Sequence, residues 1–219
     1  MSAKGAGGHR GHRETASLAG IRRAFEESVG TVIAVYAGDA TLIDRMASLV
    51  AATVARGRTV FFCGNGGSAA QAQHFAAELA VRYVVDRPAI PSVALNADTA
   101  ILTAVGNDYG FERVFARQIE SLGRRGDLLV AMSTSGSSPN VIAAVKAAKE
   151  LGLKVIGFTG ARGRAFARRC DLALVVPATA TARIQEAHLL VGHLLCERAE
   201  AVAKGRARPR RAPATRGRL

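Results

Sequence analysis

Residues 59–78 read TVFFCGNGGSAAQAQHFAAE and contain three patterns in succession. The apolar run from Thr59 to Cys63 is typical of a strand that is covered on both faces. A glycine-rich loop follows at residues 64–68, and the residues after it have a helical composition. Strand, loop and helix in this order indicate the first unit of an α/β fold.

Four further apolar runs alternate with segments long enough for crossover helices, and a last helix is expected from Ala182 to about Ala203. The pattern predicts a doubly wound, mostly parallel five-stranded sheet flanked by helices. The additional strands are expected at Ser92 to Leu95, Asp127 to Met132, Lys154 to Phe158 and Leu172 to Val176.

The region before the first strand has helical spacing. From Glu14 to about Arg56, apolar residues recur three and four positions apart, as at Ile21, Phe25 and Val29. We expect two antiparallel helices here, forming an amino-terminal helical hairpin. The whole segment 14–203 is expected to be one domain, because 219 residues are about one domain's worth of chain.

The net charge of +13 is concentrated at the two ends of the chain. Residues 1–13 hold three Lys and Arg and residues 204–219 hold seven, and neither stretch has an acid, which leaves +3 for the rest. Their Gly, Pro, Ala and Arg content predicts disordered basic tails. Solvation is the simpler role for the tails. Weak, salt-sensitive attraction to nucleic acid is the alternative, ranked lower because no aromatic residues are interleaved for base stacking.

Cysteine usage and hydropathy point to the cytoplasm. Cys63, Cys170 and Cys196 are odd in number and widely spaced, which suits reduced, buried thiols rather than a disulfide framework. No uninterrupted apolar run reaches the roughly 18 residues of a membrane helix, and the basic start lacks a signal-peptide core. We therefore expect a cytoplasmic protein without a membrane partner.

The loop after the third predicted strand reads STSGSSPN at residues 133–140 and echoes the first loop. In doubly wound sheets the ligand lies beyond the carboxyl ends of the strands. Ser138 has the character of an N-cap and Pro139 that of a first helical residue, so hydroxyls and backbone N–H groups would converge there. The loop therefore suits a phosphate monoester. An ordinary serine-rich turn with a helix cap is the alternative.

Two helices carry potential metal ligands. His74 and Glu78 lie four residues apart, on one helical face, and could grip one ion. The last helix adds Gln185, His188 and His193. Taken alone, the His74 and Glu78 pair is more often a solvated or locally hydrogen-bonded helix face than a metal site, and only its combination with the phosphate loops favours a site.

Taken together, these segments resemble the phosphoheptose isomerases, which have the sugar isomerase (SIS) fold. The resemblance extends from about Glu14 to Glu200. The matching segments are GNGGSAA at 64–70, QHFAAEL at 73–79, GNDY at 106–109, STSG at 133–136 and RIQE at 183–186. The glycine-rich loop alone would indicate only the fold, whereas His74, Glu78, Gln185 and His193 together indicate the heptose branch.

The resemblance implies a set of site residues. Zinc, one ion per subunit, would be held by His74, Glu78, Gln185 and His193, with Glu78 and His193 as the acid/base pair. The substrate would contact these four residues and also Asn65, Gly66, Gly67, Asn107, Asp108, Ser133, Thr134, Ser135 and Ser138, of which the serines would hold the phosphate.

Gln185 and His193 differ by about 12 Å along a straight helix. Their side chains must lean together, or the metal lies between their levels, or they serve sites in different subunits. The resemblance suggests sites near the interfaces of a homotetramer.

The function implied by the resemblance is conversion of D-sedoheptulose 7-phosphate to D-glycero-D-manno-heptose 7-phosphate by enediol chemistry. This would be the first step towards ADP- or GDP-heptose precursors. Two alternatives are a noncatalytic SIS protein that binds a replication-initiator partner and a phosphosugar-sensing module. The retained acid/base set weighs against both.

Overall fold

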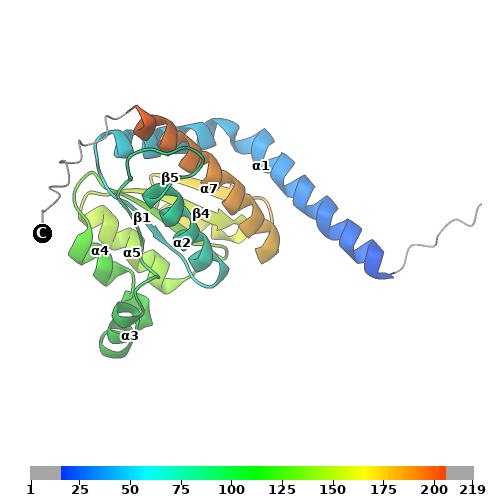
Figure 1. Ribbon diagram of the computed structural model, residues 1–219. Helices are drawn as coiled ribbons and strands as arrows, with labels where there is room; N and C mark the ends of the chain where they lie inside the picture. Colours follow the sequence, from blue (N-terminus) through cyan, green and yellow to red (C-terminus); the bar gives the residue numbers. More distant parts are fainter. Residues whose placement is uncertain (1–15, 206–219) are drawn as a thin grey trace, which may run out of the picture.

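A five-stranded parallel sheet forms the centre of the structure, a computed structural model that describes residues 16–205 (Figure 1). The strand order is β2-β1-β3-β4-β5. Each strand overlaps one of the five predicted runs, so the predicted sheet is confirmed. The strands are β1 (Val60–Cys63), β2 (Ser92–Ala94), β3 (Leu128–Ser133), β4 (Lys154–Gly160) and β5 (Leu172–Val176).

Alternate side chains of the strands enter two separate apolar cores, one on each face of the sheet. In β1, Val60 and Phe62 join one core, whereas Phe61 and Cys63 join the other. The first core is covered by α1 (Ala16–Ala55), α2 (Gly67–Ala80) and α7 (Thr181–Lys204). The second is covered mainly by α4 (Ala116–Leu122) and α5 (Pro139–Glu150). The result is a three-layer α/β/α arrangement.

Short elements complete the second face. They are α3 (Thr99–Asp108), α6 (Arg164–Ala167) and two 3-10 turns, η1 (Phe111–Arg113) and η2 (Ala161–Gly163). Within the part of the chain that the structure describes, no helix combines the length and apolarity needed to cross a membrane.

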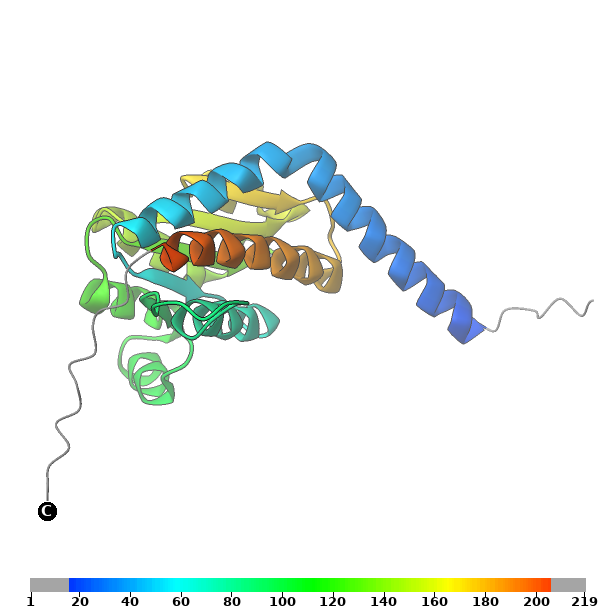
Figure 2. The same cartoon turned by 45° about the horizontal axis from the view of Figure 1, so that its top comes forward.

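The expected amino-terminal hairpin is wrong, because α1 is one continuous helix of 40 residues. The segment has no proline to interrupt the backbone ladder. Its isolated glycines, such as Gly30 and Gly38, cost only about 1 kcal/mol each relative to alanine. Figure 2 shows the carboxyl-terminal half of α1 beside α7, while the amino-terminal half extends away from the domain.

The strand order places the two small-residue loops next to each other. β1 and β3 are neighbours in the sheet, and the chain leaves them towards opposite edges, to β2 and to β4. The loops that follow β1 and β3 therefore open at a topological switch point, where ligands of such sheets bind. The predicted tails, apart from Lys204 and Gly205, lie outside the described residues.

Candidate active site

The loop between β3 and α5 (residues 133–138, here called the serine loop) turns the hydroxyl groups of Ser133 and Ser138 towards each other. The Ser133 and Ser138 Oγ atoms are 2.9 Å apart, and the Gly136 N–H donates to Ser133 Oγ at 3.1 Å. Ser138 is the N-cap of α5 and Pro139 its first residue, as predicted, but the Ser138 side chain makes no cap bond. Its hydroxyl faces Ser133 instead, so both are oriented towards the loop interior.

Gly136 gives the serine loop its shape. Its φ of +69° is in the left-handed region, and an added Cβ would lie 2.4 Å from the Cα of Gly163. Beside the loop, a cavity of about 130 Å³ is bounded by Thr134, Ser135 and Arg162, among others. Arg162 brings a positive charge to this wall, which favours an anion there.

A pair of asparagines joins the two loops. The Asn65 amide donates to Asn140 Oδ1 at 2.9 Å, and the Asn140 amide donates back to Asn65 Oδ1 at 2.8 Å. Asn140 is buried in the first turn of α5. Asn65, predicted as a substrate contact, thus uses its side chain to hold the glycine-rich loop against the serine loop. Sequence reasoning did not single out Asn140, because nothing local reveals its partner 75 residues away.

The two histidines predicted as ligands meet across the interface between α2 and α7. His74 Nε2 and His193 Nε2 lie 2.8 Å apart, and His74 Nδ1 lies 3.6 Å from Glu78 Oε1. The Glu78 side chain is 20% exposed, so it is accessible at the rim of the cluster. The structure therefore brings three of the four predicted ligands together.

Glycines let α2 and α7 approach closely at two levels. A Cβ on Gly192 would lie 2.1 Å from the Phe75 ring, and one on Gly67 would lie 2.6 Å from the Gln185 amide nitrogen. Gly67 and Gly66 thus line the start of α2. Gln185 lies beside Gly67 at the start of α2, whereas His193 contacts His74, which is two turns further along α2. The two helices run in the same direction, which keeps Gln185 and His193 at separate levels.

Tyr83 is a neighbour of His193 that sequence reasoning missed. Its ring centroid lies 5.8 Å from that of His193, and it belongs to the segment between α2 and β2. An aromatic ring in an irregular segment carries no periodic signal that could have revealed this contact.

Asn107 and Asp108 lie apart from this cluster. They occupy the last turn of α3, are exposed and bond to each other, with Asn107 Nδ2 donating to Asp108 Oδ1 at 2.8 Å. Figure 1 shows α3 at the periphery, below α4 and α5, on the side away from α7. A single chain therefore does not bring these two predicted substrate contacts to the histidines.

Burial keeps the three cysteines and His188 in neutral form. Burial raises the pKa of Cys63, Cys170 and Cys196 to about 12, so none supplies a thiolate. Burial lowers the pKa of His188 to about 4, although Thr159 O accepts at 3.4 Å. His188 packs on Phe158, and it is not part of the cluster.

The cluster has the donor chemistry that zinc prefers, namely imidazole nitrogens with a carboxylate. The two Nε2 atoms meet at 2.8 Å, a distance that fits a shared proton, and the Glu78 carboxylate lies by Nδ1 on the other side of the His74 ring. Over residues 16–205, however, no three His, Cys, Asp or Glu side chains converge as a formed metal site. The ligand types fit zinc, but within one chain the four side chains do not converge on a single point.

The sheet order, the hydroxyl-lined loop at the switch point and the histidine cluster define a SIS domain protein. The family model described as SIS domain matches residues 24–160, more than half of the chain. Within that class, the chain belongs to the phosphoheptose isomerase family.

Similar proteins and solved structures support this family assignment. The phosphoheptose isomerase of Burkholderia pseudomallei strain 1710b is 46% identical over 185 residues, which are 84% of this chain and 94% of that protein. That of Rhodospirillum rubrum is 51% identical over 174 residues, 80% of this chain and 93% of the relative. The solved phosphoheptose isomerase of Neisseria gonorrhoeae superimposes with a TM-score of 0.80 at 41% identity, covering 85% of this chain and 100% of that one.

Proposed function

We propose that this protein isomerises D-sedoheptulose 7-phosphate to D-glycero-D-manno-heptose 7-phosphate, a first step towards ADP- or GDP-heptose precursors. The observation that carries the proposal is the meeting of His74, His193 and Glu78 in a chain of the phosphoheptose isomerase family. Neither a replication-initiator-binding role nor a phosphosugar-sensing role needs such an acid/base cluster.

The serine loop would hold the phosphate. Its hydroxyls can donate to phosphate oxygens without large side chains in the way, and the start of α5 is partly positive. Ser133, Thr134, Ser135 and Ser138 are the proposed contacts, with Arg162 adding charge at the cavity wall. The Asn65 and Asn140 pair keeps this loop and the glycine-rich loop in one register.

The chemistry requires a base and a proton carrier. A proton must leave the carbon next to the ketose carbonyl and be returned to the carbonyl carbon, while a hydroxyl proton moves between the two oxygens. Glu78 is the proposed base for carbon, and His193 the proposed carrier for the oxygen-bound proton. His74 holds His193 by the 2.8 Å contact and thereby limits its orientations.

Zinc is the proposed cofactor, one ion per subunit, with His74, Glu78 and His193 as ligands and Gln185 as the fourth. When bound, zinc would polarise the carbonyl oxygen as a Lewis acid. The Gln185 side chain lies beside Gly67, two helical turns from the histidines. To serve as a ligand, its amide must therefore move towards them, or bind the ion from its own position near the start of α7.

We further propose a homotetramer with sites near subunit interfaces. Ile21, Phe25, Val29 and Ile33 recur every four residues along α1 and are 53–70% exposed, an apolar stripe of the kind that marks protein contacts. Asn107 and Asp108 lie far from the histidines within one chain, so they would serve a neighbouring subunit's site. A cytoplasmic location is proposed because all three cysteines are free thiols.

The decisive experiment is an isomerase assay on six- and seven-carbon ketose phosphates, with and without a chelator. We expect turnover of the seven-carbon substrate and its loss when metal is removed. Absence of turnover on any ketose phosphate by the metal-loaded protein would reject the proposed reaction. Full activity after exhaustive chelation would reject zinc as the cofactor without rejecting the proposed reaction.

A further inference from the structure

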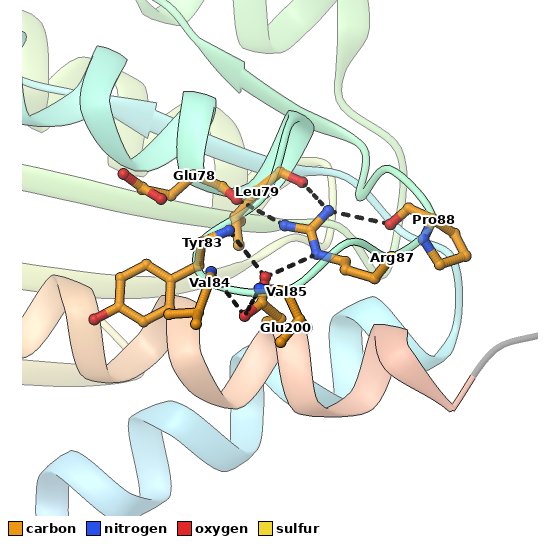
Figure 3. A network of polar contacts seen from close by, with 8 residues as sticks. All are labelled: Glu78, Leu79, Tyr83, Val84, Val85, Arg87, Pro88 and Glu200. Atoms are coloured by element: carbon orange, nitrogen blue, oxygen red, sulfur yellow. Dashed lines mark hydrogen bonds and ion pairs between the residues drawn. The ribbon is translucent and has the colours of Figure 1, made fainter.

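Arg87 caps the end of the helix that carries His74 and Glu78. Its guanidinium is fully buried and donates from Nη1 to Leu79 O and from Nη2 to Glu78 O, each at 2.7 Å (Figure 3). Both carbonyls belong to the last turn of α2, where the partial negative charge of the helix favours a cation. Arg87 therefore fixes the backbone of Glu78 itself.

Glu200 organises the segment that follows α2. Its carboxylate accepts three consecutive backbone N–H groups, from Tyr83 and Val84 at 2.9 Å and from Val85 at 3.1 Å (Figure 3). Arg87 Nε lies 3.5 Å from Glu200 Oε1, and the Glu200 side chain is only 7% exposed. Burial raises the pKa of Glu200, but the three N–H donors and Arg87 outweigh it, so the pKa is lowered overall.

The pair connects both halves of the catalytic cluster. Glu200 lies seven residues after His193 on α7, two turns along the same helical face. Through Arg87 it is joined to the Glu78 backbone, and through its N–H contacts it holds Tyr83, whose ring lies beside His193. One ion pair thus links α2, α7 and the segment that covers His193.

We propose that Arg87 and Glu200 are positioning residues that set the placement of Glu78 relative to His193 for proton transfer. The inference rests on the proposed isomerase function. A buried ion pair is weak as a source of stability, because desolvation offsets much of its attraction. Its bonds to the Glu78 carbonyl and to the Tyr83 N–H give it a role that an apolar pair of similar volume could not perform.

The test separates turnover from binding. In Arg87→Lys the charge beside Glu200 remains, but the forked contacts to the Glu78 and Leu79 carbonyls are lost. We expect kcat to fall at least about tenfold, since small displacements of catalytic groups are costly. KM for the ketose phosphate should stay within about twofold. Arg87 contacts the last turn of α2, whereas the serine loop that would hold the phosphate lies between β3 and α5.

Glu200→Gln should give the same split between kcat and KM. The matched controls make the same substitutions in exposed pairs: Arg113→Lys, which faces Glu120, and Glu150→Gln, which faces Lys146. Both should retain wild-type kcat and KM. Circular dichroism melts are used to compare only variants that are folded at the assay temperature.

A folded Arg87→Lys protein with kcat within about twofold of wild type would overturn the inference. So would a fall in kcat that matches the fraction of unfolded protein. If the wild-type protein converts no ketose phosphate, the proposed function fails. The positioning role of Arg87 and Glu200 is then tested on its own by amide hydrogen exchange. Arg87→Lys should then lower protection at residues 78–85 while β3 stays protected, and unchanged protection at 78–85 would overturn it.

Discussion

His74 Nε2 lies 2.8 Å from His193 Nε2, although 119 residues separate the two histidines in the chain. A hydrogen bond between two imidazole nitrogens needs one donor and one acceptor, so at least one of these nitrogens carries no proton. Glu78 Oε1 lies 3.6 Å from Nδ1, the other nitrogen of the His74 ring. This relationship gives the cluster its capacity for proton transfer.

Glu78→Gln should abolish catalysis while preserving the fold. The amide has the same shape but cannot take a proton from carbon, and general-base catalysis contributes about 10²- to 10⁴-fold to rate. We expect kcat for sedoheptulose 7-phosphate to fall by that factor, with an unchanged circular dichroism spectrum. Glu150→Gln on α5 is the control. A Glu78→Gln protein with wild-type kcat would remove Glu78 from the mechanism.

Ser133→Ala should weaken substrate binding more than turnover. The variant loses a hydroxyl that orients Ser138 and can donate to phosphate, and a hydrogen bond to a charged group contributes about 1.5–3 kcal/mol. KM should rise at least about tenfold. Ser121→Ala, at an exposed position of α4, should leave KM unchanged. If both variants bind substrate like wild type, the serine loop does not hold the phosphate.

Gly192→Ala should destabilise the contact between α2 and α7. The added methyl group would overlap the Phe75 ring, and overpacking a core costs about 1–3 kcal/mol. Urea unfolding should show this loss. Gly106→Ala on α3 meets open space and should be neutral or gain up to about 1 kcal/mol from helix propensity. Equal stability of the two variants would contradict the tight packing at Gly192.

Acid should destabilise the protein through His188. Its pKa is about 4 in the folded state and about 6.5 when unfolded, so between these values the unfolded chain binds more protons. This contribution to stability is complete above pH 6.5 and is lost as pH falls towards 4. The loss is on the order of 3 kcal/mol at about 1.4 kcal/mol per pH unit.

The test of this linkage compares wild type with His188→Gln. The amide does not titrate, so the free energy of unfolding of the variant should change less between pH 7 and pH 4. Parallel stability curves for the two proteins would show that His188 does not carry the acid sensitivity.

Phe25→Asp should disrupt the oligomer. The ring is 70% exposed in the centre of the α1 stripe, and burying a carboxylate against apolar side chains is strongly unfavourable. Light scattering should show a smaller species than wild type. Arg23→Asp introduces the same side chain away from the stripe and should keep the wild-type mass. An unchanged mass for Phe25→Asp would locate the interface elsewhere.

Local signals in the sequence were enough to predict the strands of the sheet and the start of α5. Each buried strand is a short apolar run, and Ser138 followed by Pro139 marks the start of α5, because these preferences arise within a few residues. The hairpin expected for residues 14–56 was wrong for the same reason. Helical spacing identifies a helix but does not say whether its exposed apolar stripe folds back or extends.

By itself, the sequence determined the succession of the five strands along the chain, the glycine-rich and serine loops, and the family, since each of these is written in short segments of contiguous residues. Only the tertiary structure decided which distant side chains meet. The pairs His74 with His193, Asn65 with Asn140 and Arg87 with Glu200 each join segments at least 75 residues apart. Such contacts depend on how the helices pack on the sheet, which no local pattern encodes.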